Sequence, residues 1–189
     1  KNFYLSLVGE HLFITMVAIT IAIIVGVAVG VVISEKRKIA GIVISIVNVL
    51  YTIPSIALLG VLISVTGIGN KTAIIALTLY ALLPVVRSTY TGIVNIDEKI
   101  VEASEAMGST KFQTMYKVKL PLAFPVIFSA IRNMVTMTIA LAGIASFVGA
   151  GGLGVAIYRG ITTNNANLLL IGSILIALLA LVSDGLLGI

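Results

Sequence analysis

The chain has 189 residues, of which 59% are hydrophobic and only 10% are charged, and its mean hydropathy is +1.20. Soluble domains carry about 25% charged residues and about 45–50% apolar ones. The composition therefore excludes an ordinary soluble domain and predicts that lipid surrounds much of the surface. Cysteine is absent and His11 is the only histidine, which excludes disulfides and argues against a histidine-bound metal. We read the net charge of +5 as a guide to membrane orientation rather than to nucleic acid.

The first half of the chain contains three apolar segments. Residues 12–33 carry no charge and predict a first span, which ends at the basic cluster of residues 34–38. Residues 39–70 are also uncharged but too long for one straight span, and Pro54 interrupts them. They predict one broken or tilted helix at roughly 42–65. A third span follows at 72–94, with Pro84 and Arg87 inside it.

The second half begins with the only long polar stretch, residues 95–119. A fourth span is predicted at 122–144, a loop rich in Gly, Thr and Asn at 147–165, and the start of a fifth span at 166–183, followed by Asp184. The sequence thus predicts an all-α, polytopic transmembrane fold of about five spanning helices. We expect residues 1–189 to form one domain, with a possible further segment or binding domain beyond residue 189.

The distribution of basic residues orients these spans. Cytoplasmic loops are enriched in Lys and Arg. The loops after the first and third spans hold Lys36, Arg37, Lys38, Lys99, Lys111, Lys117 and Lys119, whereas those after the second and fourth hold Lys71 and Arg159. We therefore expect the N-terminus outside, and residues 95–121 and the C-terminal end inside.

Residues 95–121, which we name the coupling loop, contain a spaced motif. It reads Glu102-Ala103-Ser104-Glu105-Ala106-Met107-Gly108, then nine residues, then Val118-Lys119-Leu120-Pro121. Residues 100–107 and 111–118 can form two short helices, with a sharp turn at Gly108 and Ser109. We expect Pro121 to end the second helix and start the next span. The small residues of the loop would let the backbone of another protein come close.

This spacing resembles the signature loop of permeases of bacterial binding-protein-dependent ATP-binding-cassette (ABC) importers, E-A-A-x-x-x-G followed after nine residues by I-x-L-P. Ser104 and Val118 are mild departures. The resemblance implies the fold of a type I (MetI-like) ABC importer permease in the bacterial cytoplasmic membrane, whose coupling loop docks on a cytoplasmic ATPase. It implies that the contact involves Glu102, Ala103, Ser104, Gly108, Leu120 and Pro121. A plain polar linker is the alternative interpretation.

The resemblance also implies a set of partners. They are two ABC ATPase subunits that bind ATP and Mg, a second permease chain, identical or related, and an extracytoplasmic binding protein or a fused binding domain. We expect this chain to bind no cofactor, because residues 67–72 lack the glycine that must directly precede lysine in a phosphate loop. No nucleophile–base pair can be assembled from the sequence, so we expect no catalytic residue.

Three further segments, residues 51–60, 82–93 and 147–154, resemble permeases of the osmoprotectant branch, which import glycine betaine, carnitine, choline and related quaternary amines. Alternatives are a permease for methionine, another amino acid or another trimethylated amine such as ergothioneine. A more distant one is a carrier or channel that works without ATP. The chain lacks the two similar halves that many secondary carriers show.

Several residues are candidates for a gate or a solute pathway: Pro54, Arg87, Arg132, Gly149, Gly151, Gly152 and Asp184. Ionisable groups within spans are functional candidates, but both arginines can also extend to the inner interface, and Asp184 can pair with an arginine. The glycine-rich run is either a gate, a seat for a binding protein or a close-packing turn. His11 is expected at the interface. Tyrosine and phenylalanine are scattered, so we expect selective capture of the solute in a separate binding domain.

Overall fold

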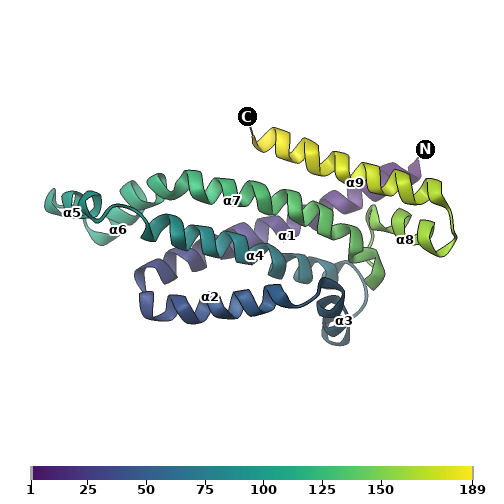
Figure 1. Cartoon of the computed structure of the whole chain (residues 1–189), viewed down its shortest axis with the longest axis horizontal. Coiled ribbons are helices and arrows are strands. Elements are labelled where there is room, and N and C mark those ends of the chain that lie inside the picture. Colours follow the sequence, from purple (N-terminus) through teal and green to yellow (C-terminus); the bar gives the residue numbers. More distant parts are fainter. Residues whose placement is uncertain (1, 189) are drawn as a thin grey trace.

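The computed structural model describes residues 2–188 and shows helices, without strands in that part of the chain (Figure 1). The α-helices are α1 (Asn2–Glu35), α2 (Arg37–Thr52), α3 (Ser55–Thr66), α4 (Asn70–Val94), α5 (Glu98–Ala106), α6 (Lys111–Thr114), α7 (Leu120–Leu141), α8 (Gly154–Thr162) and α9 (Ala166–Leu187). A π-helical segment, η1 (Met115–Lys119), and a 3₁₀ segment, η2 (Ala142–Val148), flank α7. The prediction of an all-α fold is confirmed.

The centre of the molecule is the packing of α1 against α4. Gly26 lies against Val85 and Gly30 against Thr89, so closely that a Cβ atom added at Gly30 would be 2.5 Å from the Cβ atom of Thr89. Small residues allow such an approach between membrane helices, where dispersion and not hydrophobic expulsion drives association. The two glycines of α1 therefore set the position of α4.

The second apolar segment is broken at Pro54, as predicted, but more sharply than one tilted helix would be. Helices α2 and α3 meet at 99°. Ile53 and Pro54 between them have extended backbones, with ψ angles of 126° and 133°. Proline disfavours the helical conformation of the residue before it, which places the break at Ile53. Among the described residues, four helices are long and apolar enough to cross a membrane, or five if this bent pair counts as one span.

Two features at the N-terminal end of α1 differ from expectation. The first helix begins at Asn2, ten residues before the predicted span, and has 34 residues. His11 is 1% exposed and its Nε2 atom lies 3.0 Å from the carbonyl oxygen of Ile139. His11, expected at the membrane interface, is thus buried within the protein, because the first helix begins before it and packs this side chain against the end of α7.

The segment predicted as a loop at 147–165 contains helix α8, which the sequence analysis missed. Its glycines obscured the pattern, but they have a packing role. Gly160 of α8 lies so close to α9 that an added Cβ atom would be 2.5 Å from the backbone nitrogen of Leu169. Helices α8 and α9 thus form a tight hairpin at the end of the molecule opposite α5 and α6 (Figure 1).

Candidate functional site

The coupling loop forms a helical hairpin with a cap at each helix start. The side chain of Asp97 accepts a hydrogen bond from the backbone N–H of Lys99 at 3.0 Å, which starts α5. Thr110 and Gln113 form a reciprocal capping box at the start of α6, with bonds of 2.9 and 3.3 Å. Gly108 ends α5 with a φ of +92°, a conformation that favours glycine. The predicted first short helix and the turn at Gly108 are confirmed, whereas the second predicted short helix is the start of a longer one.

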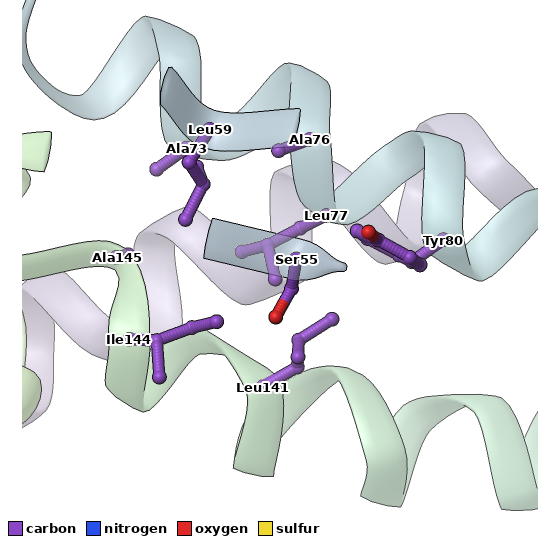
Figure 2. Close-up of a pocket in the computed structure, with 9 residues that line it drawn as sticks. All are labelled: Ser55, Leu59, Ala73, Ala76, Leu77, Tyr80, Leu141, Ile144 and Ala145. Carbon is purple, nitrogen blue, oxygen red and sulfur yellow. The ribbon is translucent and has the colours of Figure 1, made fainter. Parts of the chain in front are cut away.

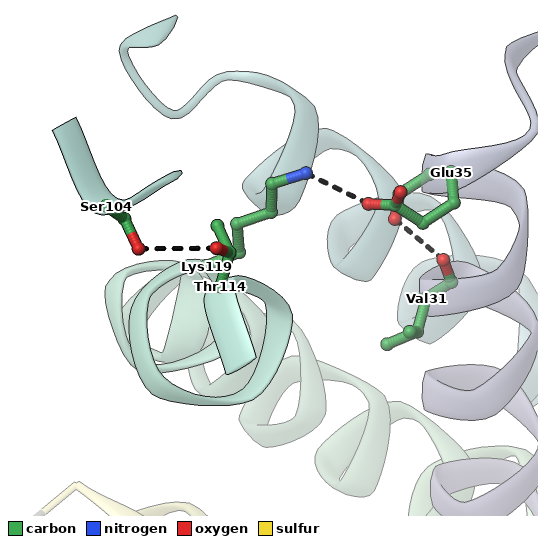
Figure 3. Close-up of polar contacts among 6 residues, drawn as sticks. Val31, Glu35, Ser104, Thr114 and Lys119 are labelled. Carbon is green, nitrogen blue, oxygen red and sulfur yellow. Dashed lines mark hydrogen bonds and ion pairs between the residues drawn. The ribbon is translucent and has the colours of Figure 1, made fainter. Parts of the chain in front are cut away.

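The interior of this hairpin is held by a hydroxyl pair. Ser104 and Thr114, 4% and 1% exposed, lie with their hydroxyl oxygens 3.2 Å apart (Figure 3). Ser104 therefore faces the second helix of its own hairpin, and the expectation that it belongs to a partner-facing set of small residues is wrong. Ala103, Ala106 and Gly108 are exposed.

Pro121 does not end the second helix. The chain is helical without interruption from Lys111 to Val148. Pro121 is the second residue of α7 and therefore lies inside this continuous helix, directly after the π-helical segment. The π-helical segment before it lets the N–H of Leu120 bond to the carbonyl of Met115, five residues back. The hairpin is thus continuous with a long helix that enters the membrane.

The base of the hairpin contacts the inner ends of three spans. Lys119 forms an ion pair with Glu35 of α1, with 2.9 Å between Nζ and Oε1 (Figure 3). Met115 packs in a buried cluster with Ile93 of α4 and with Ala123 and Ile127 of α7. A displacement of the hairpin therefore acts on α1, α4 and α7 together.

The surface of the hairpin carries apolar side chains that sequence reasoning missed. Met107 is 82% exposed, Phe112 69% and Tyr116 55%, and the two aromatic rings lie 4.5 Å apart between centroids. Helices α5 and α6 lie at the end of the molecule opposite α8 (Figure 1). An exposed apolar patch of this kind marks a surface for another protein or for lipid.

At the opposite end, residues 149–152 form the outer glycine turn, which is tied to two helices. Gly149 and Gly152 have φ angles of +70° and +92°. The N–H of Gly151 donates to the side-chain oxygen of Asn70 at the start of α4, at 2.8 Å. The N–H of Gly152 donates to a carboxylate oxygen of Glu10 in α1, at 3.0 Å. Glu10 and Asn70 lack any sequence signal that would have assigned them to this turn.

Arg132 and Asp184, both candidates from the sequence, are brought together. The Arg132 guanidinium donates two hydrogen bonds to the Asp184 carboxylate, at 2.5 and 2.7 Å. The pair joins α7 to the end of α9, and the structure thus selects pairing from the alternatives for Asp184. Arg87 is exposed and makes no ion pair with any residue between 2 and 188.

A groove of about 520 Å³ with a mixed lining runs between α4 and α7. Its lining residues are the apolar Pro84, Pro125, Val126 and Ala130 and the polar Ser88, Ser129 and Asn133. Hydroxyls elsewhere on these helices bond to their own backbone, such as Thr78 to Ile74 and Thr136 to Arg132. Ser88, Ser129 and Asn133 make no side-chain hydrogen bond within residues 2–188. Unsatisfied polar groups at membrane depth are costly unless they face a water-filled cavity or other protein.

Pro54, the remaining candidate, directly precedes Ser55, which lines a much smaller cavity of about 10 Å³ (Figure 2). Ser55 of α3, Tyr80 of α4 and Leu141 of α7 are among its lining residues. This space is about that of one water molecule, so it cannot hold a solute. It marks the place where the broken span meets α4 and α7.

A multi-pass helical membrane bundle with a capped hairpin at one end and a groove between two spans is the architecture of a transport permease. Residues 14–189 match the family described as the binding-protein-dependent transport system inner membrane component, and the chain belongs to that family. It is therefore a multi-pass inner membrane component of an ABC importer.

Relatives cover nearly the whole chain. The carnitine transport permease protein OpuCD of Listeria monocytogenes serotype 1/2a is 42% identical over 180 residues, 95% of this chain and 81% of the relative. The glycine betaine/carnitine/choline transport system permease protein OpuCD of Bacillus subtilis is also 42% identical, over 95% of this chain and 79% of its own length. Among solved structures, an inward-facing MetNI methionine ABC transporter matches with a TM-score of 0.87 and 28% identity, over 98% of this chain and 93% of that chain.

Proposed function

We propose that this chain forms the translocation path of an ATP-driven importer for quaternary-amine osmoprotectants such as glycine betaine, carnitine and choline. The observation that carries the proposal is the 42% identity, along 95% of the chain, to permeases named for these solutes. The groove between α4 and α7 has no charged residue in its lining and offers Ser88, Ser129 and Asn133 as polar contacts to small solutes that bring their own charges.

The coupling loop is the contact with a cytoplasmic ATPase in this proposal. Ala103 and Gly108 are exposed and small, so the partner's surface can approach the backbone. Glu102 is the middle residue of α5 and is exposed, so its carboxylate is available to a basic residue of the partner. Phe112 and Tyr116 extend the contact with apolar area. Leu120 and Pro121 are the first residues of α7, within the long helix, and act in transmission rather than in docking.

The partners follow from the same arrangement. Two ATPase subunits bind ATP and Mg²⁺ beneath the membrane, a second permease chain completes the path, and a separate or fused binding domain delivers the solute from outside. Closure of the ATPase subunits moves the hairpins, and the helix that runs from Lys111 to Val148 carries that motion across the bilayer. Only solute and nucleotide interactions that differ between inward-open and outward-open states can drive this change.

Three alternatives are separated by one experiment. The first alternative solute is methionine, but the likeness to a methionine transporter is only 28% in sequence and concerns the fold more than the solute. The second is ergothioneine, which shares the trimethylated amine of the proposed solutes. The chain is purified with its co-encoded partners, reconstituted in lipid vesicles and supplied with its binding domain. ATP hydrolysis is then measured with glycine betaine, choline or carnitine, and separately with methionine or ergothioneine.

We expect the quaternary osmoprotectants to stimulate hydrolysis and to accumulate inside the vesicles only with ATP. If only methionine or only ergothioneine stimulates hydrolysis, the proposed solute is wrong but the proposed ATP-driven mechanism still holds. Solute flux that is independent of ATP would show that the chain works as a carrier or channel, and would overturn the proposal as a whole.

A further inference from the structure

The break between α2 and α3 brings together two tyrosines that are far apart in the sequence. Tyr51 is in the last turn of α2 and Tyr80 is in α4, and their rings meet edge to face with centroids 6.0 Å apart. Tyr80 is 7% exposed and its hydroxyl donates to the carbonyl of Ile53 at the break. Tyr51 is 43% exposed, and its hydroxyl lies 3.4 Å from the Sδ atom of Met137 in α7.

This tyrosine pair lies in line with the groove between α4 and α7. Residues four apart lie on one face of a helix. Tyr80, Pro84 and Ser88 therefore form one stripe of α4, and Ser129, Asn133 and Met137 form one stripe of α7. The groove occupies the inner part of both stripes and the tyrosines occupy their outer part. A solute that moves along the groove passes the exposed ring of Tyr51.

The surroundings of Tyr51 favour a cation. An aromatic face attracts a quaternary ammonium group through the ring quadrupole. The C-terminal end of α2, which carries the negative end of its helix dipole, points to the same place, and no basic residue stands in its last turn. The residues that line the groove between α4 and α7 carry no charge. A permanent cation therefore meets dispersed negative potential without a carboxylate that would hold it too tightly.

We propose that Tyr51 binds the quaternary ammonium group of the solute during its passage and that Tyr80 positions Tyr51. Tyr80 does this through the edge-to-face contact and by fixing Ile53 at the break. The hydroxyls of Ser88 and Ser129 and the amide of Asn133 then face the polar end of the solute. This inference rests on the proposed function, because it requires that quaternary amines enter the path.

The test uses the whole importer, with ATPase and binding domain, in lipid vesicles that contain ATP, and choline or glycine betaine as the probe. Tyr51 is replaced by Leu, by Phe and by phenylalanines with one, two or three ring fluorines. Fluorine withdraws charge from the ring face and leaves its size nearly unchanged. We expect Tyr51→Leu to lower the maximal uptake rate about tenfold, Tyr51→Phe to stay within about twofold, and uptake to fall stepwise with each fluorine.

Matched variants separate this role from folding. Phe13→Leu removes an aromatic ring that is 60% exposed on α1, away from the groove, and should leave uptake unchanged. Tyr80→Phe loses the bond to Ile53 and should lower uptake less than Tyr51→Leu does. If uptake is the same throughout the fluorine series, Tyr51 only fills space and the inference is overturned, even if Tyr51→Leu fails to assemble. If the unmodified importer takes up no quaternary amine, the proposed function fails instead.

Discussion

The coupling loop and the outer glycine turn both depend on glycine, but for different reasons. Around Gly108 there is open space, since an added Cβ atom would meet nothing within 4 Å, and only its φ of +92° requires glycine. The outer turn is enclosed instead. A Cβ atom at Gly151 would overlap the Glu10 carboxylate, and one at Gly152 would be 3.1 Å from the Cα atom of His11.

The difference shows how the two ends are built to move. The hairpin is held together by local bonds, such as the Thr110–Gln113 capping box and the Ser104–Thr114 pair, so it moves as a unit on its helix. The outer turn is held by bonds to Glu10 and Asn70, on two other helices. It therefore changes shape only when α1 or α4 moves relative to it.

The strongest test of this comparison asks whether the two ends lie on opposite sides of the membrane. The chain has no cysteine, so Ser109→Cys and Ile68→Cys each introduce a single thiol, at the hairpin turn and at the exposed loop before α4. In intact cells we expect an impermeant thiol reagent to label position 68 fully and position 109 not at all. Both should react after detergent solubilisation. Labelling of Ser109→Cys in intact cells would show that the topology is the reverse of the expected one. The proposed contact with a cytoplasmic ATPase would then be wrong.

The next largest effect is expected at the exposed surface of the hairpin. Ala103→Trp adds bulk where the partner must approach, and Gly108→Val places a branched side chain in a left-handed conformation that costs about 1–3 kcal/mol. We expect solute uptake to fall at least about tenfold in each case, with the ATPase either lost on purification or no longer stimulated by solute. Ala166→Trp, at an exposed alanine of the opposite end, is the control. Normal assembly and uptake in both hairpin variants would show that the coupling loop is only a linker between two spans.

Substitution in the outer turn should act on transport without detaching the ATPase. Gly151→Val displaces the Glu10 carboxylate from the N–H of Gly152, so the tie between the turn and α1 is lost. We expect uptake to fall several-fold while the ATPase still co-purifies and the binding domain keeps its solute affinity. Gly41→Val has open space around it and serves as the comparison. A change in solute preference alone would assign the turn to recognition.

The smallest effect is expected inside the hairpin. Ser104→Ala removes one hydrogen bond, worth about 1 kcal/mol, and leaves the partner-facing surface as it is. We expect uptake within about twofold of the unmodified importer and a slightly lower melting temperature. Thr114→Ala removes the other half of the pair and should give the same result. A large loss of ATPase binding in Ser104→Ala would show that this hydroxyl reaches the partner.

The sequence by itself determined the features that depend on local chemistry. Apolar runs of sufficient length defined the spans, Pro54 defined the break, and the spacing from Glu102 to Pro121 defined the hairpin and the family. The turn at Gly108 was predicted because Gly108 and Ser109 permit a sharp change of direction between two helical segments. These predictions hold because the desolvation of the backbone and the geometry of proline and glycine act within a few residues.

Tertiary structure alone decided which distant side chains meet. The bond from Gly152 to Glu10 spans 142 positions and that from Gly151 to Asn70 spans 81. Tertiary structure also decided three other features: the inward direction of Ser104, the pairing of Asp184 with Arg132, and the contact between Tyr51 and Tyr80. Such contacts depend on the register in which helices pack, which the small residues Gly26 and Gly30 fix only once α1 and α4 are side by side.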